Sequence, residues 1–428
     1  MQKSLLGQGA LLSLCLILSS CGGGSGNSNT IYPPDPAPAP STQIPRSPIK
    51  HLIVVVMQNN SFDHLFGTYS GANGLDPTAA SYKQVDQAGI TVQPQLLTNL
   101  SPLDLNHTAS SYQTAYDSGK MDKYAWQNGD TSMYYFDNTS IGTATDGQKF
   151  GVATLWSYAQ RYALSDNFFA SAMASEPSNM LYMVSADPGT DPYGYPQLDG
   201  CTAALYQQNQ TSGATITSPL TTLNVGDQLS ANNISWGFYQ EYFVNEQNRT
   251  CTHYVPQENP FQYFQTTANS ANVLNFSMLG FNTMLSSATL PSVMWVQPDP
   301  ANSMHPGAGT IANGIEWLDT VVQAVKNSPE WSSTAIVVLW DESGGWYDHV
   351  PPPQLSGTIG LGARVPVIVI SPYAKANYVS HQQMDFVSVL RFIQWNWALG
   401  PFTDPSQAAR EQQSGDLCDL LTTSCGSP

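Results

Sequence analysis

One stretch of the chain reads Ala335-Ile336-Val337-Val338-Leu339-Trp340-Asp341-Glu342-Ser343-Gly344-Gly345. The apolar, β-branched run up to Trp340 predicts a buried strand, and the glycines predict its end. Two adjacent carboxylates repel each other unless a cation or a proton joins them. In a continuing strand their side chains would point to opposite faces, whereas a sharp turn lets both reach one ion. The stretch therefore favours metal-assisted hydrolysis, with a plain polar junction between strand and loop as the alternative.

Two other short, β-branched runs, His51–Met57 and Arg364–Ile370, also end in polar or turn residues and predict strands. Continuous apolar strands of this kind belong to sheets that are covered on both faces, which predicts an α/β fold. Apolar residues spaced by 3.6 positions predict a helix over 313–326, and an aromatic-rich segment predicts another over 388–399. We interpret 189–290, rich in Asn, Gln, Thr and Tyr, as insertions and loops packed on the sheet.

Active sites in such sheets lie at the carboxyl ends of the strands. The three predicted strands end at Gln58-Asn59, at Asp341-Glu342 and at Ser371-Pro372-Tyr373. The first two ends supply side chains that could bind a metal, so we expect them to meet on one edge of the sheet.

The N-terminus predicts export. Residues 1–20 contain Lys3 and a short apolar core, which is typical of a secretory signal. Leu18-Ser19-Ser20-Cys21 is similar to the bacterial lipobox, in which lipid is attached to the cysteine; an ordinary signal peptide cut elsewhere is the alternative. Residues 21–47 are rich in Gly, Ser and Pro and predict a tether. We expect a catalytic domain with insertions over 48–405, a C-terminal tail over 406–428, and a lipid-anchored protein of the bacterial cell envelope.

Four cysteines remain after Cys15 and Cys21, and an even number in an oxidising compartment indicates disulfides. Of the three possible connectivities we favour Cys201–Cys251 with Cys418–Cys425.

The chain has 14 Lys and Arg against 31 Asp and Glu, a formal net charge of −17. Such a surface repels nucleic acid and anionic lipid head groups, so we expect no nucleic-acid partner. Membrane association is expected through the lipid on Cys21.

Several blocks, taken in order, resemble the bacterial phosphoesterase family that joins phospholipases C with a group of acid phosphatases, within the alkaline-phosphatase superfamily. The segments 57–69 (MQNNSFDHLFGTY) and 341–350 (DESGGWYDHV) carry most of this resemblance. Smaller blocks are Lys120-Met121-Asp122, Ser165-Asp166-Asn167-Phe168-Phe169, Arg364-Val365-Pro366, Ser371-Pro372-Tyr373, Ser380-His381-Gln382 and Leu390-Arg391-Phe392-Ile393. The resemblance spans roughly 48–400. It implies an alkaline-phosphatase-like, three-layer α/β/α sandwich with a mostly parallel central sheet.

The resemblance also implies a site, because in that family a Glu-Asn pair, a Ser or Thr nucleophile and the Asp-Glu pair surround one divalent metal. Asn59, Asp341 and Glu342 match this pattern, whereas Gln58 stands where the family usually has glutamate. The hydroxyl position falls on Glu176, between Ser175 and Ser178. We take Ser175 as the nucleophile and expect Glu176 to replace the carboxylate that Gln58 lacks.

These ligands offer only oxygen, which favours Mg, Ca or Mn over zinc. The implied reaction is hydrolysis of phosphate mono- or diesters, including phospholipid head groups, by a metal-activated serine. Candidate catalytic histidines, which would orient phosphate and protonate the leaving group, are His107, His305 and His349; His64 and His381 are expected to hydrogen-bond within the structure. The alternatives are a catalytically impaired binding lipoprotein on the same scaffold, and sulfate-ester hydrolysis or phosphoethanolamine transfer.

Overall fold

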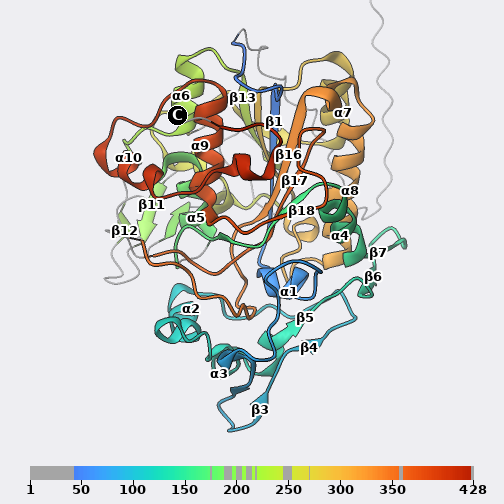
Figure 1. Cartoon of the computed structure of the whole chain (residues 1–428). Coiled ribbons are helices and arrows are strands. Elements are labelled where there is room, and N and C mark those ends of the chain that lie inside the picture. Colours follow the sequence, from blue (N-terminus) through green and yellow to red (C-terminus); the bar gives the residue numbers. More distant parts are fainter. Residues whose placement is uncertain are drawn as a thin grey trace, which may run out of the picture. The chain divides into compact units, whose positions relative to one another are not determined.

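A mostly parallel sheet of eight strands forms the centre of the protein, as the sequence predicts (Figure 1). Only β17 runs antiparallel to its neighbours β16 and β8. The computed structural model describes residues 43–173, 176–187, 195–198, 205–208, 215–216, 219–243, 253–268, 270–355 and 360–425. In spatial order the strands are β14 (Val273–Phe276), β13 (Trp236–Glu241), β15 (Val293–Gln297), β1 (His51–Met57), β16 (Thr334–Trp340), β17 (Val367–Ile370), β8 (Ala163–Ser165) and β18 (Tyr378–Ser380).

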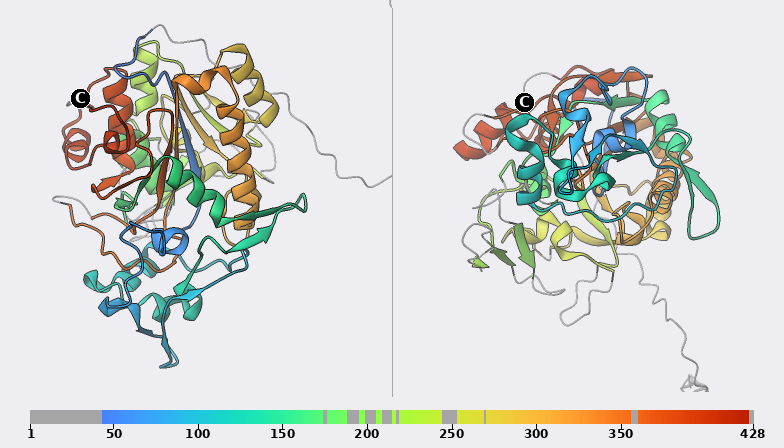
Figure 2. Two further views of the ribbon diagram at one scale, coloured as in Figure 1. Left: turned by 45° about the vertical axis from the view of Figure 1, so that its right-hand side comes forward. Right: turned by 90° about the horizontal axis from the view of Figure 1, so that it is seen from below.

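Helices cover both faces of this sheet, which gives the expected three layers (Figures 1 and 2). One layer holds α4 (Val152–Arg161), α7 (Met278–Ser287) and α8 (Ile311–Lys326). The other holds α5 (Glu176–Ser185), α6 (Val225–Ala231), α9 (Phe386–Asn396) and α10 (Pro405–Gln412). The predicted helices over 313–326 and 388–399 correspond to α8 and α9.

The two central strands are buried because both faces are covered. All seven residues of β16 are buried, and so are six of the seven in β1. The strands pair in parallel from His51 opposite Thr334 to Met57 opposite Trp340. Continuing this register places Gln58 and Asn59 beside Asp341 and Glu342.

The end of β17 does not lie at the edge of the sheet that the sequence predicts for it. Because β17 is antiparallel, Ser371-Pro372-Tyr373 follows it at the edge where β16 begins; the Ser371 hydroxyl donates to the carbonyl of Thr334 at 2.9 Å. The connection from β16 to β17 contains no described helix, and antiparallel neighbours need no crossover helix. Arg364, just before β17, therefore lies at the edge of Asn59 and Asp341, and Ser371-Pro372-Tyr373 does not.

The interpretation of 189–290 as insertions and loops is wrong in part. This stretch supplies β13 and β14 to the central sheet, together with α6 and α7. Its polar strand ends, such as Gln240-Glu241, interrupt the apolar run that identifies a buried strand. The predicted Cys201–Cys251 bond lies outside the described residues.

A second group of small elements lies at the end of the sheet where β1 ends (Figure 1). Its helices are α1 (Phe62–Phe66), α2 (Ala109–Tyr116) and α3 (Tyr124–Asn128). The group also contains β3 (Thr91–Val92), β4 (Gln95–Leu96) and β5 (Tyr134–Tyr135). The remaining short strands are β2 (Gln84–Val85), β6 (Ile141–Thr143), β7 (Lys149–Gly151), β9 (Phe168–Phe169), β10 (Tyr195–Leu198), β11 (Leu205–Gln208), β12 (Thr215–Ile216) and β19 (Met384–Asp385).

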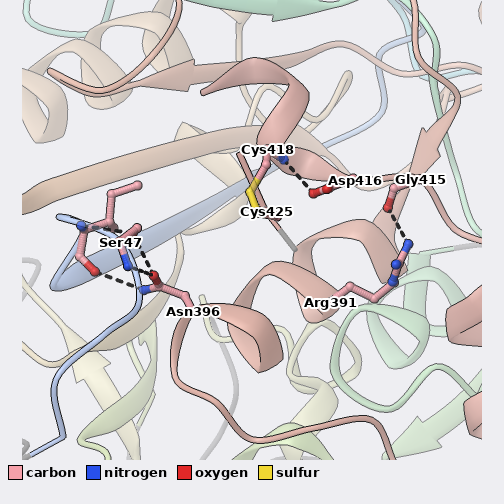
Figure 3. Close-up of a disulfide and its surroundings, with 8 residues drawn as sticks. Ser47, Arg391, Asn396, Gly415, Asp416, Cys418 and Cys425 are labelled. Carbon is pink, nitrogen blue, oxygen red and sulfur yellow. Dashed lines mark hydrogen bonds between the residues drawn. A yellow bond between two sulfur atoms is a disulfide. The ribbon is translucent and has the colours of Figure 1, made fainter. Parts of the chain in front are cut away.

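The described part of the predicted tail, 406–425, is folded against the body. Gln394 on α9 donates to Glu411 at 2.7 Å. The predicted disulfide Cys418–Cys425 is present (Figure 3). Near it, the hydroxyl of Ser47 donates to Oδ1 of Asn396 at 2.7 Å, so the last residues of the predicted tether, 43–47, include one that is bonded to the body. Among the described residues, no helix combines the length and the apolarity needed to cross a bilayer.

Candidate active site

The ends of β1 and β16 meet, as the sequence predicts. The backbone N–H of Asn59 donates to Oδ1 of Asp341 at 2.8 Å, and that of Asn60 donates to the carbonyl of Glu342 at 3.0 Å. Asn59 has a φ of 58°, a left-handed conformation that asparagine tolerates. Gly344 has a φ of 64°, and a Cβ there would lie 2.4 Å from the Asn59 carbonyl oxygen. The glycine is therefore required for the turn that brings the two ends together.

Four polar atoms at these strand ends are buried and, within the described part of the chain, have no hydrogen-bond partner. They are Oε1 of Gln58, Nδ2 of Asn59, Oδ2 of Asp341 and Oε1 of Glu342. Buried polar atoms are rarely left unpaired, and a bound ion is one of the standard reasons. Burial raises the pKa of Asp341, and the neighbouring charge of Glu342 raises it further. Burial also raises the pKa of Glu342. The site therefore holds more negative charge than it can stabilise by itself.

Two further carboxylates adjoin this group through Gln58. The amide Nε2 of Gln58 donates to Oε1 of Glu176 at 3.0 Å and to Oε1 of Glu258 at 2.6 Å. Burial, followed by the charge of Glu258, raises the pKa of Glu176 well above its usual value. Burial raises the pKa of Glu258 to about 8. Glu176 thus lies beside the predicted ligands, while its predicted partner Ser175 lies outside the described residues, directly before α5.

A cavity of about 400 Å³ opens next to these side chains. Two of the three predicted catalytic histidines, His107 and His305, line this cavity together with the predicted metal ligands Asn59, Glu176 and Glu342. The lining residues are Asn59, Leu105, Asn106, His107, Thr108, Glu176, Pro177, Gln257, His305 and Glu342.

Each of these two histidines has one ring nitrogen held by a carbonyl. Nδ1 of His107 lies 2.7 Å from the carbonyl of Leu105, and Nδ1 of His305 lies 2.7 Å from the carbonyl of Pro306. A carbonyl accepts, so Nδ1 carries the proton in both rings and Nε2 is left for other partners. Nε2 of His107 is 3.9 Å from Oε1 of Glu342. Burial alone would lower the pKa of His107, but Glu342, the Leu105 carbonyl and Asp104 together raise it.

The third predicted histidine is elsewhere: His349 does not line this cavity. Its Nδ1 donates to Oδ2 of Asp63 at 2.6 Å. Oδ1 of Asp63 accepts from the buried guanidinium of Arg364 at 2.9 Å, and Arg364 also donates to Asp348 at 3.2 Å. This cluster joins the chain after β1 to the chain after β16. The catalytic role of His349 stays a prediction, and its ring is engaged by this buried ion-pair network and not by the cavity.

The expected structural roles of His64 and His381 are consistent with their contacts. Nδ1 of His64 lies 2.7 Å from the carbonyl of Tyr134, and burial lowers the pKa of this ring to about 3. Nδ1 of His381 lies 2.9 Å from Asp166.

Two residues of the site are absent from the sequence predictions. Glu258 lies in the segment 256–260, which shows no periodic pattern. In the sequence it cannot be distinguished from any other acidic residue of a loop. Asp104 lies 3.5 Å from Nδ1 of His107, and with His107 and His305 it forms a group that could also hold a cation. No local pattern distinguishes it from the other exposed acids of the chain.

A family model described as the phosphoesterase family matches residues 49–400. Phospholipase C B of Mycobacterium tuberculosis is 26% identical, over 81% of this chain and 72% of that protein. Non-hemolytic phospholipase C of Pseudomonas aeruginosa is 25% identical over 81% of this chain and 53% of its own length, so the chain spans about half of that relative. A solved structure from Vibrio parahaemolyticus, in the alkaline phosphatase superfamily, matches with 9% identity and a TM-score of 0.37 over 82% of this chain and 77% of that one, a likeness too weak to bear on function. Because the family model covers most of the chain, the protein belongs to the phosphoesterase family and is a hydrolase of phosphoric ester bonds.

Proposed function

We propose that the protein hydrolyses phosphate mono- or diesters in the cavity beside Asn59 and Glu342, with one divalent cation held at the ends of β1 and β16. The observation that carries this proposal is a set of three buried oxygens with no partner among the described residues: Oε1 of Gln58, Oδ2 of Asp341 and Oε1 of Glu342. The unpartnered atom of Asn59 is its amide nitrogen, a donor that suits a phosphoryl oxygen. Carboxylate and amide oxygens suit a hard cation such as Mg²⁺, Ca²⁺ or Mn²⁺. The raised pKa values of Asp341 and Glu342 support a cation there, since positive charge would stabilise their ionised forms.

The ligands would be Asn59, Asp341, Glu342 and, through Oε1, Gln58, with Glu176 beside them as a further carboxylate. The group of Asp104, His107 and His305 fits a hard cation less well. It offers a single carboxylate, which is about half exposed, and Nδ1 of each ring is already held by a carbonyl. When bound, a divalent cation supplies positive charge that lowers the pKa of a nearby hydroxyl and stabilises charge on phosphoryl oxygens.

The chain itself supplies the remaining chemistry. The Ser175 hydroxyl releases its proton to solvent, and its oxygen forms a bond to phosphorus while the bond from phosphorus to the leaving oxygen breaks. Nε2 of His107 or His305, when protonated, gives its proton to the leaving alkoxide. Water then attacks the phosphoserine and releases phosphate or a phosphorylated head group, which regenerates the serine. Ser175 immediately precedes Glu176, a residue that lines the cavity, and this supports Ser175 over Ser178 as the nucleophile.

The substrate class is proposed from the cavity and from the relatives. A volume of about 400 Å³ suits a small phosphate ester or a lipid head group, and its walls combine two histidines with amide and carboxyl groups. Both relatives compared above are named phospholipases C. We therefore propose phosphomonoesters or phospholipid head groups as substrates.

We further propose that residues 1–20 are removed on export, that Cys21 carries lipid, and that 21–47 tether the catalytic body to the cell envelope. Replacing Cys21 with alanine should move the protein from the membrane fraction to the soluble fraction. Mass spectrometry of the mature N-terminus would contradict lipidation if it finds a free thiol there.

An activity comparison tests the proposed reaction. The purified protein is assayed with an aryl phosphate, an aryl phosphorylcholine and an aryl sulfate, with and without chelator. We expect cleavage of at least one phosphate ester, loss of activity on chelation, and loss in both Asp341→Asn and Ser175→Ala, while Ser178→Ala remains active. Cleavage of the sulfate alone would contradict the proposal, and a protein that binds phosphate but cleaves nothing would favour the binding lipoprotein.

A further inference from the structure

The amide of Gln58 has a single favourable orientation when Glu176 and Glu258 are ionised. The side chain is 1% exposed, and its Nε2 contacts Oε1 of Glu176 at 3.0 Å and Oε1 of Glu258 at 2.6 Å. An amide nitrogen has two hydrogens, and these two carboxylates use both. Rotating the amide by half a turn would place its oxygen against two carboxylate oxygens. The carboxylates therefore fix Oε1 on the other side, where it has no partner among the described residues.

Glu258 is itself held by amides from three neighbouring strands. It is 3% exposed, and it accepts from Gln58 after β1, from Gln297 on β15 and from Gln240 on β13. The last two bonds are 3.1 Å each and both reach Oε2. Gln240 also donates to the carbonyl of Val255 at 3.0 Å, which fixes its orientation. Such a set of donors, with no opposing acceptor, is built for a buried carboxylate.

We propose that Glu258 is a positioning residue for the cation site: it holds the Gln58 amide so that Oε1, and not Nε2, is presented beside Asp341. This inference rests on the proposed function. A carboxylate that accepts a hydrogen bond from the part of a ligand side chain that is not bound to the metal orients that side chain and raises the basicity of its ligating atom. With the cation bound, whose charge favours the ionised form of Glu258, Gln58 and Glu258 would act as a pair in which the negative charge lies on the residue behind the ligand and not on the ligand itself.

The pairing predicts an unexpected result for one substitution. Gln58→Glu introduces the residue that the resembling family usually has, yet here it would place a carboxylate oxygen where Nε2 now meets Glu176 and Glu258. Like charges at such distances are costly when buried. Adding Glu258→Gln supplies an amide donor at position 258, which can bond to the new carboxylate at position 58. The double variant should therefore recover what the first substitution loses.

Mn²⁺ binding by the full chain tests this, measured by calorimetry at neutral pH after removal of bound metal. We expect Gln58→Glu and Glu258→Gln each to weaken binding by about tenfold, the size typical of changes behind a ligand. The double variant should return to within about threefold of the wild type, because the two effects are coupled. Glu241→Gln is the matched control: Glu241 follows Gln240 at the end of β13, and its carboxylate accepts from the N–H of Asp299 and from the ring nitrogen of Trp317, among other contacts. Its Mn²⁺ affinity should stay that of the wild type.

Unfolding temperatures with and without Mn²⁺ separate positioning from general stability. If the Gln58–Glu258 pair had only a structural role, Gln58→Glu would lower both unfolding temperatures equally. The inference requires that Gln58→Glu also reduces the rise in unfolding temperature that Mn²⁺ causes. If Glu258→Gln does not fold, Glu258→Asp, which shortens the reach to Gln58, takes its place. Tighter binding by Gln58→Glu alone, or a double variant as weak as the two singles combined, would overturn the inference only. A wild-type protein that takes up no Mn²⁺ would overturn the proposed function and this inference with it.

Discussion

Replacing Arg364 with methionine should destabilise the folded protein by about 3–5 kcal/mol, the cost of breaking a buried ion pair by removing one partner. The guanidinium is fully buried. It bonds to Asp348 at 3.2 Å and to Asp63 at 2.9 Å, and it donates to the carbonyls of Asn73 at 2.6 Å and Asp166 at 2.8 Å. Without it, two carboxylates remain buried with only His349 as a cationic partner, and two carbonyls lose a donor.

The charge balance of Asp348 supports this magnitude. Burial raises the pKa of Asp348 to about 6, even with Arg364 lowering it. Loss of the guanidinium would raise this pKa further, so the carboxyl would take up a proton at neutral pH. A second substitution, Asp348→Asn, should therefore recover part of the loss, because it removes one uncompensated acid.

Urea unfolding followed by tryptophan fluorescence measures the effect. Arg161→Met is the control, since Arg161 is exposed at the end of α4 and its replacement should change the free energy of unfolding by less than about 0.5 kcal/mol. A loss below about 1 kcal/mol in Arg364→Met would mean that water reaches and screens the cluster, and the reasoning from burial would be wrong.

Gly344→Ala should lower both Mn²⁺ uptake and the free energy of unfolding, because the new Cβ would lie 2.4 Å from a backbone carbonyl oxygen. The control Gly71→Ala also has a positive φ but open space around it, so it should cost only about 1 kcal/mol of backbone strain. Equal effects in the two variants would contradict this prediction. For the chelated protein, the free energy of unfolding should fall by roughly 1.5 kcal/mol between pH 6.5 and 8. The pKa of Glu258 is about 8 in the folded state and about 4.5 in the unfolded state, so the folded state holds an extra proton that it loses over this range. His64, whose pKa is about 3 when folded and about 6.5 when unfolded, acts in the opposite direction, but only about 0.4 kcal/mol of its contribution falls above pH 6.5. Glu258→Gln should therefore flatten the slope, and a rise in stability over this window would refute the assignment. His107→Asn should lower kcat for alkyl phosphates by about 100-fold and for nitrophenyl phosphate much less, because a nitrophenolate leaves without a proton; an equal loss for both esters would exclude His107 as the acid.

Composition and periodicity are sufficient to predict the two central strands, β1 and β16, and the long helices from the sequence. β1, β16 and α8 each form a continuous pattern over seven or more residues, so their bounds follow closely from the sequence. β8 and β18, with three residues each, are too short to carry a period. The direction of β17 is set by the connection that precedes it, and an apolar run alone does not encode it.

The candidate site divides in the same way. Asn59 and Asp341-Glu342 can be placed together from sequence, because two parallel strands in register end side by side. Glu258 cannot, since its bond to Gln58 joins positions 200 residues apart and no local pattern marks it. The position of His349 could not be predicted for a related reason: it is close to the acidic doublet in sequence, but the turn at Gly344-Gly345 places it in the Arg364 cluster.

Crystals grown with Mn²⁺ and measured for anomalous scattering test the central claim directly. The account predicts an ion in contact with the carboxylates of Asp341 and Glu342, and loss of that ion in Asp341→Asn. An ion found only among Asp104, His107 and His305, with the doublet at the end of β16 left free, would contradict it.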